Sequence, residues 1–232
     1  MDGDTHEKAV ERVATLFEAA RAAGVHRIVF SSHTQCSLDS PYKYIAGKAQ
    51  ACEALRNSGI PAYGIVRPCG IFGDTPKESL LFNSAAWVMR RTPMFLLPSD
   101  GQARFQPIHV RDMAELMHKI GSDKTTQSWE KDACGPDAPT ALELFTHLKK
   151  AINSRAIVAA PGLSTSLVSK LSTPINWYTK DILLDTDDLD LMCNGLTVAN
   201  DPTDPDIATR RSILSWLDEV GDDLGQEYFS SI

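Results

Sequence analysis

The chain has 232 residues, a net charge of −7 and 43% hydrophobic residues. This length and composition allow one domain with a sizeable core, and the acidic balance, with a pI of about 5.3, excludes a general nucleic-acid-binding role. No stretch approaches the roughly 18 apolar residues of a membrane span. The acidic, polar start MDGDTHEKAVER is unlike a signal peptide, and the five cysteines are scattered. We therefore expect a cytoplasmic protein with free thiols.

Helices and strands alternate along the first part of the chain. Residues 4–23 carry an apolar stripe at helical spacing. The β-branched run at 27–32 predicts a strand, which we expect to be central in its sheet. A helix over 44–57 follows, and a second strand over 63–67 ends at a proline. A helix followed closely by an apolar strand is half of a βαβ unit, so this order predicts an α/β fold with a parallel sheet.

The second part of the chain is richer in helices. Further helices are predicted over 79–91, 112–120 and 140–153, and short strands over 93–97, 106–110, 128–134 and 157–160. Thr140 and Glu143 form a capping box, and the segment after residue 160 reads as short helices broken by prolines. We expect residues 1–75 to continue the sheet, and residues 76–232 to form an α-rich substrate-side lobe that is interleaved with it.

Two hydroxyls and a Tyr–Lys pair flank the loop between the first strand and its helix. Ser31 and Ser32 end the strand, and Tyr44 and Lys48 are four residues apart, which places them on one helix face. The ammonium favours the phenolate and lowers the tyrosine pKa from its usual value of about 10, so the pair can exchange a proton. The competing interpretation is a surface tyrosine and lysine, with strand-end hydroxyls that bond the backbone.

Four segments in this order carry a family resemblance. They are AARAAGVHRIVFSS, the Tyr44-x-x-x-Lys48 pair, GIPAYGIVRPCGIFGD and FQPIHVRDMAELM. Together they resemble the extended and atypical branch of the short-chain dehydrogenase/reductase superfamily, which includes NAD-dependent epimerase/dehydratase-like, NmrA-like and complex-I-accessory-subunit-like proteins. The resemblance implies a Rossmann-like sheet, with Tyr44 as the acid/base, Lys48 as its partner and Ser32 positioning the substrate oxygen.

The same resemblance implies a nicotinamide cofactor, NAD or NADP. Lys48 would then also orient the ribose, and the loop after the second strand would pass over the nicotinamide. The implied cofactor-binding residues are Ser31, Lys48, Arg67, Pro68, Cys69, Gly70 and Phe72. We expect no metal site, because His33-x-x-Cys36 has no second ligand pair near it. His109 is expected to pack at a strand end, and Asp112 to cap the following helix.

The phosphate-binding fingerprint of a dinucleotide fold is absent from these 232 residues. No G-x-G-x-x-G turn follows a predicted strand. By resemblance, the chain lacks the first three or so βα units, on the order of 80 residues. Hence we expect the chain alone to bind NAD(P) weakly or not at all, and the choice between NAD and NADP stays open.

Three functions are consistent with the sequence. The first is an NAD(P)-dependent oxidoreductase or epimerase/dehydratase-like enzyme acting on a hydroxyl or carbonyl group of a small molecule. The second is a non-catalytic NAD(P)-binding regulator or assembly factor. The third is an inactive fragment without the pyrophosphate-binding loop. The family resemblance also implies a homodimer through the helices at 5–23 and 44–57.

Overall fold

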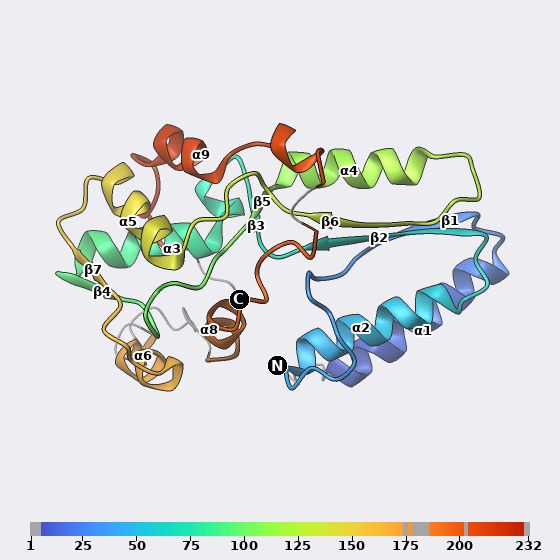
Figure 1. Cartoon of the computed structure of the whole chain (residues 1–232), viewed down its shortest axis with the longest axis horizontal. Coiled ribbons are helices and arrows are strands. Elements are labelled where there is room, and N and C mark those ends of the chain that lie inside the picture. The colour runs from blue at the N-terminus through green and yellow to red at the C-terminus, as the bar shows by residue number, and fades with distance from the viewer. Residues whose placement is uncertain (1–5, 174–175, 178–185, 202–203, 230–232) are drawn as a thin grey trace.

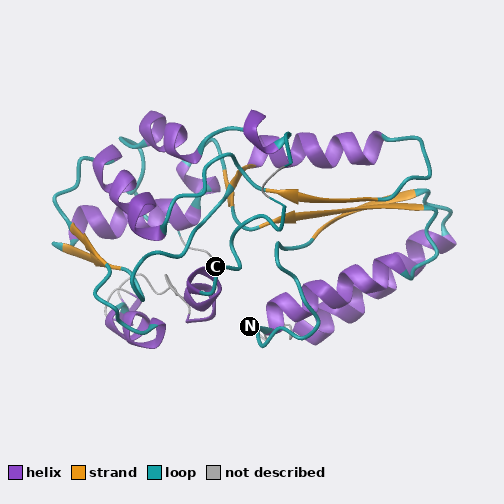
Figure 2. Cartoon of the chain, viewed as in Figure 1, coloured by secondary structure: helices purple, strands orange, loops and turns teal. Residues whose placement is uncertain are grey.

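The computed structural model describes residues 6–173, 176–177, 186–201 and 204–229. Helices and strands alternate in it as the sequence predicts (Figure 2). In the sheet half, the elements are α1 (His6–Ala22), β1 (Arg27–Ser31), α2 (Lys43–Arg56) and β2 (Ala62–Pro68). They are followed by β3 (Ile71–Phe72), α3 (Leu80–Arg91), β4 (Met94–Leu96), β5 (Ile108–His109), α4 (Val110–Ser122) and β6 (Trp129–Ala133). The C-terminal part contains α5 (Ala141–Ala151), β7 (Ile157–Ala159), α6 (Thr165–Leu171), α8 (Thr186–Cys193) and α9 (Ile213–Val220).

The main sheet has the order β1-β2-β6, and both pairings are parallel. Helices α1 and α2 cover one face of this sheet and α4 covers the other (Figure 1). The predicted α/β class with a parallel sheet is therefore confirmed. One expectation differs: among the described residues, β1 is an edge strand of this sheet and not a central one.

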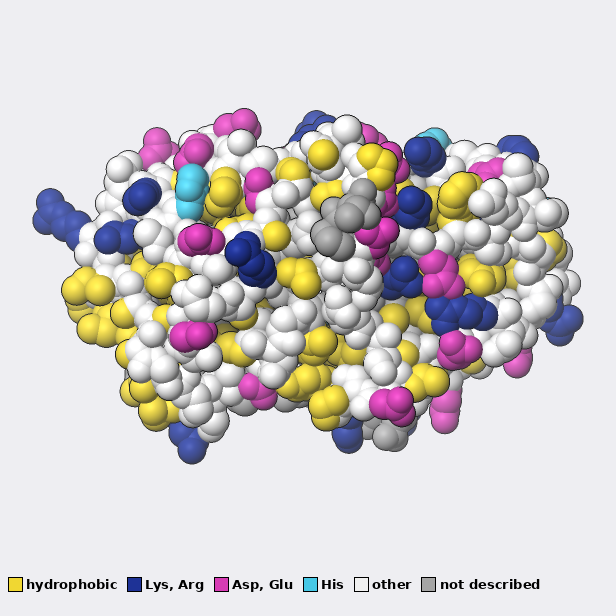
Figure 3. All heavy atoms as spheres, viewed as in Figure 1, with side chains coloured by type: hydrophobic (Ala, Val, Ile, Leu, Met, Phe, Trp, Pro, Cys, Tyr) yellow, Lys and Arg dark blue, Asp and Glu magenta, His cyan; other side chains and the backbone are white. Residues whose placement is uncertain are grey.

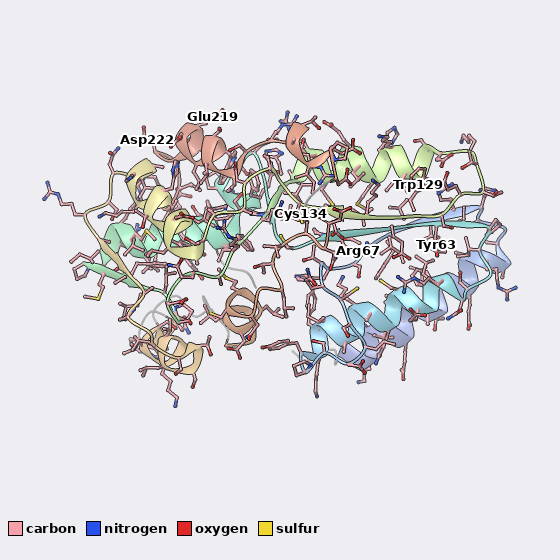
Figure 4. All side chains as sticks on the ribbon, viewed as in Figure 1. Tyr63, Arg67, Trp129, Cys134, Glu219 and Asp222 are labelled. Carbon is pink, nitrogen blue, oxygen red and sulfur yellow. The ribbon has the colours of Figure 1, made fainter. Side chains whose placement is uncertain are left out.

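Alternation along β2 divides the sheet core between its two faces. Ile65 packs towards α1 and α2, and its neighbour Val66 packs towards α4. Figure 4 shows the same division, with Tyr63 and Arg67 on the α2 side and Trp129 on the α4 side. At Gly64 a Cβ atom would lie 2.3 Å from Ile120 Cγ2. A residue without a side chain is therefore needed here for α4 to approach the sheet so closely.

The other lobe has its own core, between α3, α5 and α9. Two short parallel pairs, β3 with β5 and β4 with β7, run along its margins. The Thr140–Glu143 capping box is present at the start of α5 as predicted. The start of α4 differs from the prediction. The His109 ring caps it by accepting a hydrogen bond from the Arg111 amide, while the carboxylate of Asp112 binds Arg211.

Apolar side chains reach the surface of this second lobe. Met94, Ile157 and Leu171 are 48%, 60% and 53% exposed, and hydrophobic atoms gather over β4, β7 and α6 at the left of Figure 3. Met94 and Leu171 also line an apolar cavity of about 120 Å³, together with other residues of α3, β4 and α6. Within the described ranges, no helix combines the length and the hydropathy needed to cross a bilayer.

Candidate functional site

One face of α2 is directed at the end of β1. Tyr44, Lys48 and Cys52 follow one another at intervals of one turn on this face. Lys48 Nζ donates a hydrogen bond of 3.0 Å to the carbonyl oxygen of Ser31, and lies 5.6 Å from the centre of the Tyr44 ring. Burial lowers the pKa of Lys48, and the nearby Cys52 opposes this shift. The structure thus brings the predicted Tyr–Lys pair together at the end of the predicted strand.

The Ser32 hydroxyl lies beneath this pair. Ser32 is 2% exposed, and its backbone amide extends the parallel ladder by bonding the Val66 carbonyl at 2.8 Å. Its Oγ accepts a hydrogen bond of 3.1 Å from the Cys52 thiol and lies 3.9 Å from the sulfur of Cys36. The sequence did not reveal these two thiols as partners of Ser32, because nothing in it shows that the loop residue Cys36 and the α2 residue Cys52 face the same hydroxyl.

His33 is a further component that sequence reasoning considered only as a metal ligand. Its ring packs edge-on against the Tyr44 ring, with centres 5.7 Å apart. Nδ1 lies 2.6 Å from the Thr34 carbonyl oxygen, which can only accept, so Nδ1 carries the proton. Burial lowers the pKa of His33. A neutral imidazole therefore lies beside the phenol and leaves Nε2 as an acceptor.

A segment from the C-terminal part of the chain crosses the carboxyl edge of the sheet. We call residues 194–200 the strap. The Asn194 amide donates to the Tyr42 hydroxyl at 2.9 Å, and the Thr34 hydroxyl donates to the Leu196 carbonyl at 2.9 Å. These bonds hold the loop between β1 and α2. No local pattern in the sequence signals them, because the partners are more than 150 positions apart.

The other end of the strap joins a charged network. Arg67 of β2 donates to Asp132 and to Glu130 of β6, each at 2.8 Å, and Arg56 of α2 binds both oxygens of Glu130 at 2.8 and 2.9 Å. The Asn200 amide donates to the second oxygen of Asp132 at 2.5 Å. Acidic and basic side chains gather in this middle region of the face shown in Figure 3. The network links α2, two strands and the strap.

The network predicts an acid-sensitive component of stability. Hydrogen bonding by Arg56 lowers the pKa of Glu130, although burial opposes the shift. Because the pKa of Glu130 is lower in the folded chain than its ordinary value of 4.5, the ionised carboxylate stabilises the fold at pH values above 4.5. This stabilisation is lost as the pH falls through the pKa of the folded state. We expect Glu130→Gln to lower the urea midpoint clearly at pH 7 and much less at pH 3. The exposed Glu219→Gln is the control, and an equal Glu130→Gln deficit at both pH values would contradict the prediction.

Comparison with known proteins gives one curated relative. No family model matches the chain. The chain is 29% identical over 153 residues to the mitochondrial NADH-ubiquinone oxidoreductase 40 kDa subunit of Neurospora crassa. This match covers 66% of the chain, which spans 38% of the relative's length.

Solved structures agree with the chain over most of its length. The Citrobacter triphenylmethane reductase complexed with NADP(H) superposes with a TM-score of 0.73 at 13% identity, covering 94% of this chain and 73% of that one. An NADPH-dependent quinone oxidoreductase of Escherichia coli complexed with NADPH gives a TM-score of 0.68 at 18% identity, covering 91% of this chain and 71% of that one. A nucleoside-diphosphate-sugar epimerase of Staphylococcus aureus gives a TM-score of 0.67 at 18% identity, covering 94% of this chain and 74% of that one. The chain has a Rossmann-like α/β fold. The resemblance to the extended and atypical short-chain dehydrogenase/reductases is thereby confirmed at the level of the fold.

In this Rossmann-like fold, the predicted cofactor-binding stretch 67–72 leaves the sheet beside the Tyr–Lys pair. The Pro68 carbonyl accepts a bond from the Thr34 amide at 3.1 Å, which joins this exit to the β1 loop. Cys69 is 8% exposed; burial raises the pKa of its thiol, which donates to the Gln106 carbonyl at 2.8 Å. Phe72 is fully buried against Trp216 and His109.

Gly70 has a packing role in the same stretch. A Cβ atom there would lie 2.5 Å from the Phe105 ring, so the missing side chain makes room for this aromatic ring. Several side chains of the stretch are therefore committed to internal contacts. Contact between this stretch and a nicotinamide remains a prediction, and it would come chiefly from the backbone.

Proposed function

We propose that the carboxyl edge of β1 and β2 is an oxidoreductase site that accepts the nicotinamide end of NAD or NADP and acts on a hydroxyl or carbonyl group of a small molecule. The observation that carries this proposal is the position of Lys48, whose ammonium is held 3.0 Å from the Ser31 carbonyl on the helix face that it shares with Tyr44. Two of the similar structures are complexes with NADPH and NADP(H), which supports the choice of cofactor.

Each residue of the site has a proposed role. Tyr44, which is 39% exposed, exchanges a proton with the substrate oxygen. Lys48 supplies the positive charge beside the phenol. Ser32 holds the oxygen in place through its hydroxyl, which must first turn away from the Cys36 sulfur. The neutral ring of His33 fixes the orientation of the Tyr44 ring by its edge-on contact. The bound nicotinamide supplies the hydride acceptor or donor.

The residues present fit the nicotinamide half of the cofactor. The Lys48 ammonium has three N–H donors, one of which binds Ser31, so the others can bind ribose hydroxyls. Ser31 and the backbone of the 67–72 stretch complete this half. The pyrophosphate half of the cofactor needs a different element. In a dinucleotide fold, the G-x-G-x-x-G turn and the helix after it hold the pyrophosphate. These 232 residues contain no such turn.

A nucleotide titration tests this proposal directly. If only the nicotinamide and ribose end is held, the full chain should bind NADPH weakly and with an affinity comparable to that of reduced nicotinamide mononucleotide. Lys48→Met should weaken the binding of both nucleotides to a similar extent, because it removes the ribose contact that they share. The exposed Lys170→Met on α6 is the control. Binding of NADPH that is micromolar, or unaffected by Lys48→Met, would contradict the proposed geometry.

A second candidate is a non-catalytic subunit or assembly factor. The match to the 40 kDa subunit of NADH-ubiquinone oxidoreductase favours it. The two functions differ in the response to a single change. In the enzyme, Tyr44→Phe abolishes turnover. In the assembly factor, the unmodified chain turns over neither quinones nor aldehydes with NADPH, and Tyr44→Phe leaves nucleotide and partner binding intact.

A homodimer through α1 and α2 is a further part of the proposal. These helices lie side by side on one face of the sheet (Figure 1), and Leu16 of α1 is 62% exposed. An apolar side chain at this position suits a contact between copies. Sedimentation velocity should show a dimer that Leu16→Glu dissociates and that Leu171→Glu, on α6, does not. A monomer at all concentrations would exclude this contact.

A further inference from the structure

Two thiols converge on one hydroxyl next to the candidate site. Cys36 is half-buried in the loop after β1, and Cys52 is fully buried on α2, two turns after Tyr44. The Cys52 thiol donates to Ser32 Oγ at 3.1 Å, and the same hydroxyl is directed at the Cys36 sulfur at 3.9 Å. Cys36 also packs against the cluster that contains Cys52. Both sulfur atoms therefore lie within 4 Å of a single oxygen atom.

The pKa values of the two thiols are shifted in opposite directions. The adjacent Cys52 side chain lowers the pKa of Cys36 to about 6; burial opposes this, while the Ser32 hydroxyl and the charges of Arg67 and Arg56 add to it. The same interaction, together with burial, raises the pKa of Cys52. At neutral pH the accessible sulfur is thus a thiolate, and the enclosed sulfur keeps its proton. This division of roles is the one that thiol oxidation requires.

We propose that Cys36 and Cys52 form a redox-active dithiol, in which Cys36 reacts with hydroperoxides and Cys52 resolves the product to a disulfide. The Cys36 thiolate attacks one peroxide oxygen, the O–O bond breaks, and the leaving oxygen takes up a proton to form an alcohol or water. Cys36 is then a sulfenic acid, oxidised by two electrons. The Cys52 sulfur attacks the Cys36 sulfur, the S–O bond breaks, and water leaves with the Cys52 proton.

Disulfide formation would change the site above it. Ser32 would lose the S–H donor of Cys52 and the thiolate acceptor of Cys36, the two side-chain partners that now hold its hydroxyl. Cys52 shares its helix face with Tyr44 and Lys48, so the change would occur next to the Tyr–Lys pair. This link to turnover rests on the proposed function, whereas the dithiol does not.

Peptide mapping of the full chain tests the dithiol independently of any nicotinamide chemistry. After exposure to stoichiometric hydrogen peroxide and blocking of free thiols, the expected product is a Cys36–Cys52 linked peptide pair that lacks two hydrogen atoms. Cys36→Ser should prevent its formation. In Cys52→Ala, dimedone should trap a sulfenic acid at Cys36, because the resolving thiol is gone. Cys193→Ser is the matched control, since Cys193 is also half-buried but burial raises its pKa.

Alkylation rates give a second readout on the unmodified protein. The iodoacetamide rate at Cys36 should rise through a midpoint near pH 6, well below that at Cys193. Oxidation or alkylation of Cys193 ahead of Cys36 would overturn the proposal, and so would a Cys36 sulfenic acid that persists while Cys52 is present. If Cys52→Ala fails to fold, the wild-type map and Cys36→Ser, which changes a loop residue, still decide the outcome.

Discussion

Replacing Tyr44 with phenylalanine is expected to lower the rate of the proposed NADPH-dependent reduction of a small carbonyl substrate by about 10²- to 10⁴-fold, the usual contribution of a general acid. The phenol is the proposed proton donor to the substrate oxygen, and phenylalanine keeps the ring that packs against His33. Single-turnover measurements at fixed NADPH would report the chemical step. The nucleotide affinity should change little, because the ribose contact is assigned to Lys48.

Tyr42→Phe is the matched control for this experiment. Tyr42 lies two residues away, and its hydroxyl is bonded by the Asn194 amide at the end of the strap. Its loss should affect stability slightly and the chemical step far less than the loss of the Tyr44 hydroxyl. Equal rates for the Tyr44→Phe variant and the unmodified chain would remove Tyr44 from the reaction and leave the non-catalytic role as the better explanation.

Arg67→Ala is expected to destabilise the fold by about 3 kcal/mol, because it leaves a buried carboxylate without its cationic partner. The Asp132 side chain is only 6% exposed and that of Arg67 is 20% exposed, so water cannot fully replace the guanidinium. The substitution also removes the link from Arg67 to Glu130. The measurement is the free energy of unfolding in urea at pH 7.

Two further variants separate charge from geometry in this prediction. Arg67→Lys keeps the charge but cannot bridge two carboxylates with a planar guanidinium, so an intermediate loss of stability is expected. Arg155→Ala removes an exposed arginine and should change stability by less than about 0.5 kcal/mol. If Arg67→Ala lowers the free energy of unfolding no more than Arg155→Ala does, the network contributes nothing to stability.

Local patterns in the sequence predict much of this structure. The Tyr44–Lys48 face follows from helical spacing, and the end of β2 follows from Pro68, so both were predictable from a few neighbouring residues. The cap of α4 was predicted wrongly, since Asp112 is a usual capping residue and a histidine ring is not. The aspartate is instead engaged by Arg211, which is 99 positions away.

The remaining features of the site depend on contacts between distant segments. Gly70 suggested close approach to a ligand, but the space beside it is filled by the Phe105 ring from another loop. The thiols around Ser32 could not be paired in advance, because neither the loop position of Cys36 nor the helix position of Cys52 indicates which residue the side chain faces. The strap was not predicted because its partners are more than 150 positions away in the sequence.

The strap has a consequence for the order in which the molecule can be assembled. Thr34 and its partner Leu196 are separated by 162 positions. At a synthesis rate of roughly 5 to 20 residues per second, the second partner is made roughly 8 to 30 s after the first. During that interval the loop carrying Ser32, His33 and Cys36 has neither of its bonds to the strap, although α2 and β2 can already form. The candidate site is therefore completed late in synthesis, and ribosome-bound chains that stop before residue 194 should expose Cys36 to alkylating reagents.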